Sequence, residues 1–310
     1  MTEFGLIDSI ARMCETLPAN GWEGIGDDCA VLPLGDEALV VSADMLAEGV
    51  HFLRHAAAAR EIGRKSLAVN LSVVAAMGAR PGATVLSLSL PQDAMDGWIE
   101  EFMAGYTELS AEHGVALVGG DTTASAAGIT VNVTVFGRTP LANIKRRSAA
   151  VAGDIVAVAG RLGASGAGLR DILNGECDTP AAHAHMNPEA QIDEGIWLGG
   201  RAEVHAMMDV SDGVASDIRH IMERSGVGAD IELEKVPADA DLRTALCAGE
   251  DYKLLLTVAA DGFAAVAAGF ETRFGRPLYP IGSTTADAGV LRWLRDGRPT
   301  AEEFRGFVHY

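Results

Sequence analysis

Five short stretches, spread along most of the chain, place acidic side chains in a glycine turn or at the end of an apolar strand. They are GIGDDCAV (24–31), VVSADML (40–46), LVGGDTT (117–123), MMDVSDG (207–213) and CAGEDYKL (247–254). A single Asp beside glycine is an ordinary turn former or helix cap. Five such segments can converge only if something positive holds them, because like charges repel. The pattern therefore favours an α/β fold whose strand ends gather carboxylates around a cation.

The expected cation is magnesium, because the acidic segments offer hard oxygen ligands without the histidine and cysteine spacing of a zinc site. The four cysteines are scattered with no C-x-x-C pair, at Cys14, Cys29, Cys177 and Cys247. This usage gives little support to a disulfide framework and favours a reducing cytoplasm.

Charge and hydropathy argue against two classes of partner. The formal net charge is −19, and a phosphate backbone needs a basic face, so we expect no nucleic-acid partner. No run of eighteen apolar residues occurs, so no membrane partner is expected. The first residues, MTEFGLIDSIARMCE, carry acids and lack the apolar core of a signal peptide.

Hydrophobic periodicity predicts strands alternating with helices in two parts. Strands are expected at 38–43, 83–90, 129–136 and 154–160, and helices at 58–77, 94–113, 213–225 and 261–274. The polar stretch LANIKRRSAAVAGD marks the expected boundary between an N-terminal domain (1–140) and a C-terminal domain (141–310). Residues 177–195 contain His, Pro and Asn, and we interpret them as an irregular connection.

The chain has no Walker-A loop, so binding of phosphate would need another device. The segment GRLGASGAGL (160–169) follows a strand and opens a helix, so its amides could cradle an anion. A glycine turn that packs helix on strand explains the segment equally well. The basic run 145–147 is either a solvated linker or a source of bidentate phosphate contacts. His51 follows the second acidic segment, and a lone histidine is more often structural than functional.

Several motifs together make the chain similar to a known family. They are GIGDDCAV, SADMLAEGVHF, GRKSLAVNLSVVAAMGARP, VGGDTT, RRSAAVAGD, MDVSDGVASDI and AGEDYKLLLTV, in this order over nearly the whole chain. The chain resembles the thiamine-monophosphate kinases of the aminoimidazole-ribonucleotide-synthetase-like superfamily. EGVHF and the NLS-x-x-AAMGA helix favour this family over its superfamily relatives.

This resemblance implies a fold and an activity. The fold is α/β (α+β), with two domains whose mixed sheets have helices packed outside. The N-terminal domain binds metal and ATP, and it pairs two subunits as a homodimer. The activity is direct in-line transfer of the ATP γ-phosphate to thiamine monophosphate, giving thiamine diphosphate and ADP with the help of several Mg²⁺ ions and without a phosphoenzyme.

The resemblance also assigns roles to residues of this chain. Catalysis through metal falls to Asp28, Asp44, Asp121 and Asp209. The implied metal ligands are these four together with Ser42 and Asp212. The implied ATP contacts are Gly120, Asp121, Arg147 and Ser211, and the implied substrate contacts are His51, Glu250 and Phe307. Asp27 is expected to fix the turn that carries Asp28.

Position 73 departs from the family pattern. The family helix usually reads N-L-S-D at this point, with the Asp as a metal ligand, whereas this chain has Val73. Ala43 also stands where a threonine is common. Because valine cannot bind Mg²⁺, a nucleotide-binding homologue with weakened catalysis stays open as an alternative. A second alternative, independent of this position, is another ATP-dependent enzyme of the superfamily.

Overall fold

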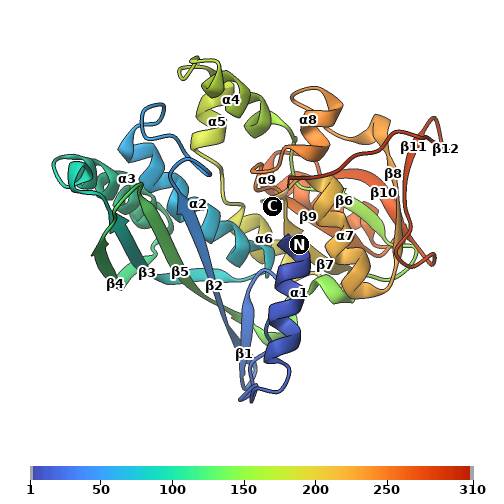
Figure 1. Cartoon of the computed structure of the whole chain (residues 1–310). Helices are drawn as coiled ribbons and strands as arrows, with labels where there is room; N and C mark the ends of the chain where they lie inside the picture. The colour runs from blue at the N-terminus through green and yellow to red at the C-terminus, as the bar shows by residue number, and fades with distance from the viewer. Residues whose placement is uncertain (1–2, 308–310) are drawn as a thin grey trace.

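The computed structural model of the chain describes residues 3–307 and contains two domains, each built around one mixed β-sheet. Figure 1 shows the two sheets on opposite sides of the molecule, with α2 (Ala59–Ala76) and α6 (Ile192–Gly199) in the region between them. The predicted two-domain α/β architecture is confirmed. Within the described residues, no helix is long and apolar enough to span a bilayer.

The N-terminal sheet has the strand order β1-β2-β5-β3-β4, and only β3 and β4 pair in parallel. Its alternating sequences bury every second residue of β5, such as Val131, Val133 and Val135, against the helices. The strands are β1 (Ala30–Leu34), β2 (Glu37–Ala47), β3 (Arg80–Leu90), β4 (Ala116–Ala124) and β5 (Thr130–Pro140).

Helices α2 and α3 (Trp98–His113) pack closely through two glycines. A Cβ on Gly63 would lie 2.0 Å from the carbonyl oxygen of Phe102, and one on Gly105 would lie 1.9 Å from that of Arg60. Any larger residue at either position would push the helices apart. This packing fixes α2, whose Val69 and Val73 line the cavity described below.

Side chains on the other face of the N-terminal sheet, such as Phe136 and Arg138 of β5, are not buried, and the strand β4 lies at the edge of this sheet. All nine residues of β4 are exposed, and Val118 is 64% exposed. The N-terminal helix α1 (Glu3–Cys14) also leaves apolar side chains in solvent, with Ile10 43% and Met13 68% exposed. Unpaired edges and apolar faces of this kind are typical of surfaces that another chain covers.

The C-terminal sheet has the strand order β12-β11-β8-β10-β6-β9-β7. Strand β9, next to the edge strand β7, is buried along its whole length between two apolar clusters. The strands are β6 (Ile155–Val158), β7 (Val204–Asp209), β8 (Gly228–Glu232), β9 (Leu254–Val258), β10 (Tyr279–Thr285), β11 (Leu291–Arg295) and β12 (Arg298–Pro299). The remaining helices are α4 (Ala164–Leu173), α5 (Pro180–Met186), α7 (Val214–Ser225), α8 (Leu242–Cys247) and α9 (Phe263–Phe274).

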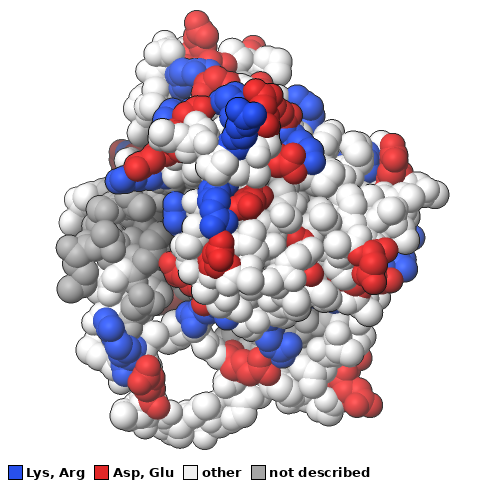
Figure 2. Space-filling model, turned by 90° about the vertical axis from the view of Figure 1, so that its right-hand side faces the viewer, with Lys and Arg blue, Asp and Glu red and all other residues white. Residues whose placement is uncertain are grey.

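The surface charge of the C-terminal domain is locally balanced. Figure 2 shows basic side chains next to acidic ones over the face turned to the viewer. On β11, Arg292 pairs with Asp230 at 3.2 Å and Arg295 pairs with Glu302 at 2.8 Å. These exposed pairs add little stability, but they show that the net charge of −19 is not spread evenly over the molecule.

The prediction of an irregular connection over 177–195 is wrong. The segment forms α5 and the start of α6. Its Pro180 occupies the first turn of α5, where a missing N–H costs nothing, and the Thr179 hydroxyl caps the helix by accepting from Ala182 N–H at 3.0 Å. Pro180, one of the residues that suggested a loop, is therefore a helix-start signal.

Candidate active site

A cavity of about 330 Å³, lined by residues of both domains, gathers side chains that are far apart in the sequence. Residues to which the sequence analysis gave no role in the site also line it, among them Val69, Val73 and Tyr252. Neither Gly120 nor Asp121 lines it. Of the twelve predicted site residues it brings together ten: Asp28, Ser42, Asp44, His51, Arg147, Asp209, Ser211, Asp212, Glu250 and Phe307.

Asp28 is a buried acid that pairs with Arg147 across the cavity wall. Arg147 Nη2 donates a 2.7 Å hydrogen bond to Asp28 Oδ1, and Asp28 is 8% exposed. The second carboxylate oxygen, Oδ2, is buried and has no hydrogen-bond partner within residues 3–307. A buried carboxylate oxygen without a partner costs free energy. This atom is therefore suited to bind a cation.

Asp27 holds the turn that carries Asp28, but it does so by a long-range contact. Its Oδ1 accepts a 2.7 Å hydrogen bond from the backbone N–H of Arg147. Arg147 follows the first domain and begins a short 3₁₀ turn (Arg147–Ala149). The two adjacent acids of GIGDDCAV thus bind the backbone and the side chain of one arginine.

Asp209 ends β7 and is the most strongly perturbed acid of the cavity. Its pKa is raised to about 8, mainly by burial and also by the nearby carboxylates of Asp28 and Asp44. Ser72 Oγ on α2 donates a 2.5 Å hydrogen bond to Asp209 Oδ2, which opposes the shift. Three mutually repelling carboxylates from two domains create a strong demand for positive charge at this point.

Two asparagines position the acid-bearing part of β2. Asn70 Oδ1 accepts from the backbone N–H of Asp44 at 3.2 Å, and Asn132 Nδ2 donates to the Asp44 carbonyl at 3.2 Å. Ser42 lies two residues before Asp44, so both side chains lie on the same side of the strand. That side carries the buried residues of β2 and borders the cavity.

The donor chemistry of the cavity fits Mg²⁺. No group of three His, Cys, Asp or Glu side chains in the described part of the chain is arranged to hold one ion. Mg²⁺ commonly binds through one or two carboxylates and fills its other positions with water and substrate phosphates. The unpartnered oxygen of Asp28 and the repulsion that acts on Asp209 are the observations that favour such an ion.

Glu250 is presented to the cavity by a strained loop. The backbone φ angle is +73° at Gly249, +54° at Glu250 and +49° at Tyr252, all in the left-handed region that favours glycine. A Cβ on Gly249 would lie 2.3 Å from the carbonyl oxygen of Ser211, and that carbonyl accepts a 2.7 Å hydrogen bond from Glu250 N–H. Strain of about 1 kcal/mol or more per non-glycine residue persists only where neighbours impose it, so the position of Glu250 is tightly determined.

The C-terminal tail adds Phe307 to the same cavity. Phe307 N–H donates a 2.9 Å hydrogen bond to the carbonyl of Asp212, which follows β7. Gly306 permits this approach, because a Cβ there would lie 2.5 Å from both the Asp212 carbonyl oxygen and Ser216 Cβ. The tail thereby places an aromatic side chain, 47% exposed, beside the acidic residues.

Gly120 and Asp121 lie in β4, at the edge of the N-terminal sheet. Asp121 pairs in register with Ser87 of β3, and the register continues through Asn132 of β5 to Met45 of β2. Asp121 is therefore level with the residue after Asp44 but three strand spacings away, about 14 Å. Within one copy of the chain these acids do not share a single ion, and the roles of Gly120 and Asp121 stay predictions.

The helix start at GRLGASGAGL is occupied by a carboxylate of the chain itself. Asp251 Oδ2 accepts from Gly163 N–H at 2.7 Å, and its Oδ1 accepts from Ser165 N–H at 3.2 Å. Burial raises the pKa of Asp251 to about 6, although these bonds oppose the shift. Of the two interpretations of this segment, the structure favours packing of a helix on a strand, because an internal acid takes the amides that an anion would use.

The basic run 145–147 divides into three separate contacts. Lys145 is buried and donates to the carbonyl oxygens of Arg201 at 2.7 Å and Val204 at 2.8 Å. Arg146 forms an ion pair with Glu23 at 2.8 Å on the surface. Only Arg147 lines the cavity, so it is the member of the run that can bind a nucleotide phosphate.

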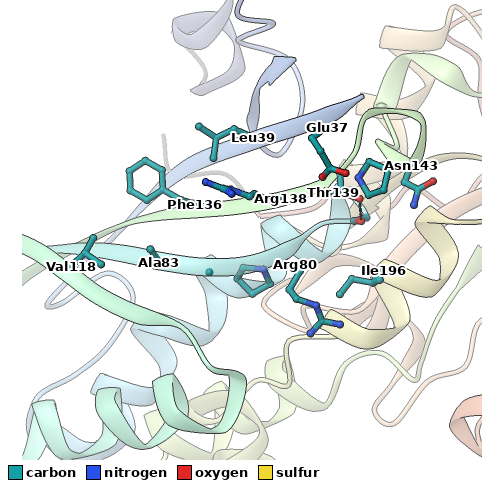
Figure 3. Close-up of a pocket in the computed structure, with 14 residues that line it drawn as sticks. Glu37, Leu39, Arg80, Ala83, Val118, Phe136, Arg138, Thr139, Asn143 and Ile196 are labelled. Carbon is teal, nitrogen blue, oxygen red and sulfur yellow. Dashed lines mark hydrogen bonds between the residues drawn. The ribbon is translucent and has the colours of Figure 1, made fainter. Parts of the chain in front are cut away.

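A second cavity, of about 820 Å³, is larger but lacks convergent chemistry. It lies over the beginning of β2 and β3, and it contains none of the predicted site residues. Arg80 and Arg138 are directly opposed in register, yet Figure 3 shows their guanidinium groups pointing in different directions, with Leu39 and Phe136 near Arg138. The arrangement forms no common anion site, so the smaller cavity is the candidate active site.

Sequence reasoning missed Ser72, Lys65 and His185, which touch Asp209 or Glu250. The signal for two of them was present on α2. Lys65 and Ser72 share helical spacing with the apolar Val69, so they fall on the buried stripe. A buried lysine needs a partner for its charge, so the position of Lys65 on this stripe could have indicated that it forms a buried ion pair.

Two family models match the chain: "AIR synthase related protein, N-terminal domain" over residues 26–139 and "AIR synthase related protein, C-terminal domain" over residues 151–293. Thiamine-monophosphate kinase of Escherichia coli K12 is 37% identical, with 93% of this chain and 91% of that protein covered. The chain belongs to the thiamine-monophosphate kinase family. The family member of Haemophilus influenzae is 33% identical over 100% of this chain and 98% of its own length.

Solved structures agree with this family assignment. "AaThiL complexed with AMPPCP and TMP" superposes with a TM-score of 0.84 at 31% identity, covering 100% of this chain and 97% of that one. Thiamine-monophosphate kinase from Stenotrophomonas maltophilia gives a TM-score of 0.76 at 37% identity, covering 96% and 98%. Escherichia coli HypE, a hydrogenase maturation protein, shares the fold at 20% identity and a TM-score of 0.73 over 97% of both chains. The family resemblance seen in the motifs is confirmed.

Proposed function

We propose that this chain is an ATP-dependent thiamine-monophosphate kinase that forms thiamine diphosphate and ADP. The observation that carries the proposal is the convergence of Asp28, Asp44 and Asp209, from two domains, in one cavity beside Arg147. Two phosphorylated substrates repel each other as they approach. A site that concentrates carboxylates around cations can neutralise both and bring them into line.

In the proposed mechanism the protein supplies positions and charge rather than a covalent nucleophile. Asp28, Ser42, Asp44, Asp209 and Asp212 would hold Mg²⁺, which neutralises the phosphates and favours in-line transfer when it is bound. Arg147 and Ser211 contact ATP phosphates. Arg147 pairs with Oδ1 of Asp28 at 2.7 Å, so the unpartnered Oδ2 would be the atom of Asp28 that holds Mg²⁺, while other N–H groups of the guanidinium would face phosphate. His51, Glu250 and Phe307 form the side of the cavity assigned to thiamine monophosphate.

The test is product formation by the purified chain. We expect ADP and thiamine diphosphate in equal amounts from ATP and thiamine monophosphate, with no reaction when EDTA removes Mg²⁺. An Asp209→Asn variant should lose at least about a hundredfold in kcat, because it removes a charge that holds the ion. Folded wild-type protein that makes no thiamine diphosphate at millimolar Mg²⁺ contradicts the proposal. ADP formation with a different phosphate acceptor would instead favour another enzyme of the superfamily.

We also propose a homodimer formed through the N-terminal domain. The open sheet face, the nine exposed residues of β4 and the apolar side chains of α1 support it. A second copy of the chain would cover these surfaces and remove the exposed strand edge. Light scattering should therefore give about twice the mass of the chain, 32.3 kDa. A monomer at micromolar concentration contradicts the proposal.

We propose that Gly120 contacts ATP and that Asp121 binds both ATP and metal. These roles require the bound nucleotide to reach β4, either of the same copy of the chain or of the second copy. Co-refolding of an Asp121→Asn chain with an Asp209→Asn chain separates these cases. If the two acids act from different copies, random pairing restores about a quarter of the wild-type activity. If both acids act within one copy, the mixture stays as inactive as its components. An active Asp121→Asn chain would remove Asp121 from the site.

A further inference from the structure

A lysine of the N-terminal domain is buried against the acid of the strained loop. Lys65 on α2 is 0% exposed. Its Nζ lies 2.9 Å from Glu250 Oε1 and 3.3 Å from His185 Nε2. A buried ammonium group is costly unless it is paired, so these two contacts with the C-terminal domain account for its position.

His185 and Ser165 complete the network around Lys65. The ammonium group of lysine can only donate, so His185 Nε2 accepts and the ring proton lies on Nδ1. His185 Nδ1 lies 2.9 Å from Ser165 Oγ and 3.5 Å from Glu250 Oε2. Burial, together with the charge of Lys65, lowers the pKa of His185 to about 4, so the imidazole is neutral near pH 7. The network is therefore one cation and one anion, linked through a neutral ring.

Glu250 stands at the boundary of two cavities. It lines the candidate active site and also a cavity of about 420 Å³ behind it, which Ser165 lines too. The charged or titratable groups that act on its carboxylate are Lys65, His185 and His51. Lys65 and His185 lie within 3.5 Å of its two oxygens. The two groups in contact with the carboxylate oxygens, Lys65 and His185, do not themselves line the candidate active site, whereas His51 does.

We propose that Lys65 is a positioning residue, which holds the Glu250 carboxylate at the acceptor side of the active site and fixes it to α2 of the other domain. His185 and Ser165 keep Lys65 in place. The inference rests on the proposed function, because it takes Glu250 as a contact of thiamine monophosphate. Without Lys65, Glu250 keeps its strained backbone but loses the cation that orients its side chain, and the binding of the acceptor substrate weakens.

The test is a comparison of the two Michaelis constants in a Lys65→Met variant, which keeps the length of the side chain and removes its charge. We expect KM for thiamine monophosphate to rise at least tenfold, while KM for ATP stays within twofold of the wild-type value. A general loss of structure would lower kcat or raise both constants. Arg64→Met is the matched control, because Arg64 is the neighbouring residue on α2 and pairs with Glu112 at 3.0 Å on the surface. It should change neither constant.

A double variant decides whether Lys65 acts through Glu250. If it does, Lys65→Met should add less than twofold to the KM of Glu250→Gln for thiamine monophosphate. If the two substitutions raise the KM for thiamine monophosphate independently, so that their fold-changes multiply in the double variant, the inference is overturned. An unchanged KM in Lys65→Met overturns it as well. If Lys65→Met does not fold, Ser165→Ala carries the same test with an expected threefold rise, and no rise overturns the inference. Wild-type turnover, measured in parallel, tests the proposed function separately.

Discussion

Ser72 of the N-terminal domain donates a 2.5 Å hydrogen bond to Asp209 at the end of β7 in the C-terminal domain. Both residues are buried, and the contact joins α2 to the strand end that carries the most perturbed acid of the site. The two domains are therefore coupled at the carboxylate that the proposed mechanism needs most. This contact gives Ser72 a role that the metal-ligand assignment did not include.

Replacing Ser72 by Ala should weaken the binding of Mg²⁺. The hydroxyl lowers the pKa of Asp209, so its removal leaves more of the acid protonated and less of it able to bind a cation. A lost hydrogen bond to a charged group corresponds to roughly a tenfold effect, measured as the Mg²⁺ concentration for half-maximal rate. Ser66→Ala is the control, because Ser66 is equally buried on α2 but donates to the Gly63 carbonyl at 2.9 Å. Equal Mg²⁺ requirements in the two variants would contradict the account.

Arg147 should be needed for ATP, and its neighbour Arg146 should not. Arg147→Met is expected to raise KM for ATP at least about tenfold, because it removes a charge-assisted phosphate contact. Arg147→Lys should restore little of this loss, since an ammonium group lacks the planar fork of donors. Arg146→Met removes only a surface pair with Glu23. A similar KM for ATP in all three variants would refute the assignment.

Val73→Asp should reduce the requirement for Mg²⁺. Val73 is half-buried and lines the cavity with Asp28, Asp44 and Asp209. An added carboxylate offers the ions another ligand, so half-maximal activity should come at a lower Mg²⁺ concentration. Without Mg²⁺ the same variant should unfold at lower temperature, because a fourth negative charge joins three others. Val73→Asn has a similar shape without the charge. If it shifts the Mg²⁺ titration equally, charge is not the reason.

Asp251 and His185 should give opposite slopes of stability against pH. The pKa of Asp251 is raised from 3.8 to about 6, so its contribution is present below pH 3.8 and is lost as the pH rises to about 6. The pKa of His185 is lowered from 6.5 to about 4, so its contribution is present above pH 6.5 and is lost as the pH falls to about 4. Each group changes the free energy of unfolding by about 3 kcal/mol at most over its pH range. In the wild-type chain the two opposite changes largely cancel.

Asp251→Asn removes the pH dependence of stability that comes from Asp251 and leaves the one that comes from His185. Urea unfolding should then show the free energy of unfolding rising between pH 4 and pH 6.5 more steeply than in the wild-type chain. His185→Gln should show the reverse, with stability falling as the pH rises from 4 to 6. Curves that run parallel to the wild-type curve in both variants would mean that neither group titrates as the structure implies.

The sequence allowed most of the site to be predicted, because strand ends are local features. Asp28 stands just before β1 and Asp209 ends β7, and strand ends of an α/β fold tend to meet. Asp44 and Asp121 show the limit of the rule, because each lies within its strand. The order of the strands, which no local pattern determines, places Asp121 at the far edge of the sheet.

Contacts between distant segments could not be predicted in the same way. Lys65 and His185 are polar residues on helices whose partners lie in the other domain. Likewise, the carboxylate that occupies the start of α4 comes from Asp251, which belongs to the GEDY motif rather than to the glycine-rich segment. Periodicity predicted the helix that carries Lys65 but not α5, which carries His185. Only the packing of the two domains determines which buried charges meet.

The central claim is that acids of both domains hold one group of cations, and binding of Mn²⁺ in place of Mg²⁺ tests it most directly. Electron paramagnetic resonance, with a non-hydrolysable ATP analogue present, counts free Mn²⁺ as the chain is titrated. The account predicts that Asp28→Asn in the N-terminal domain and Asp209→Asn in the C-terminal domain each weaken Mn²⁺ binding at least about tenfold. Wild-type affinity for Mn²⁺ in both variants would contradict it.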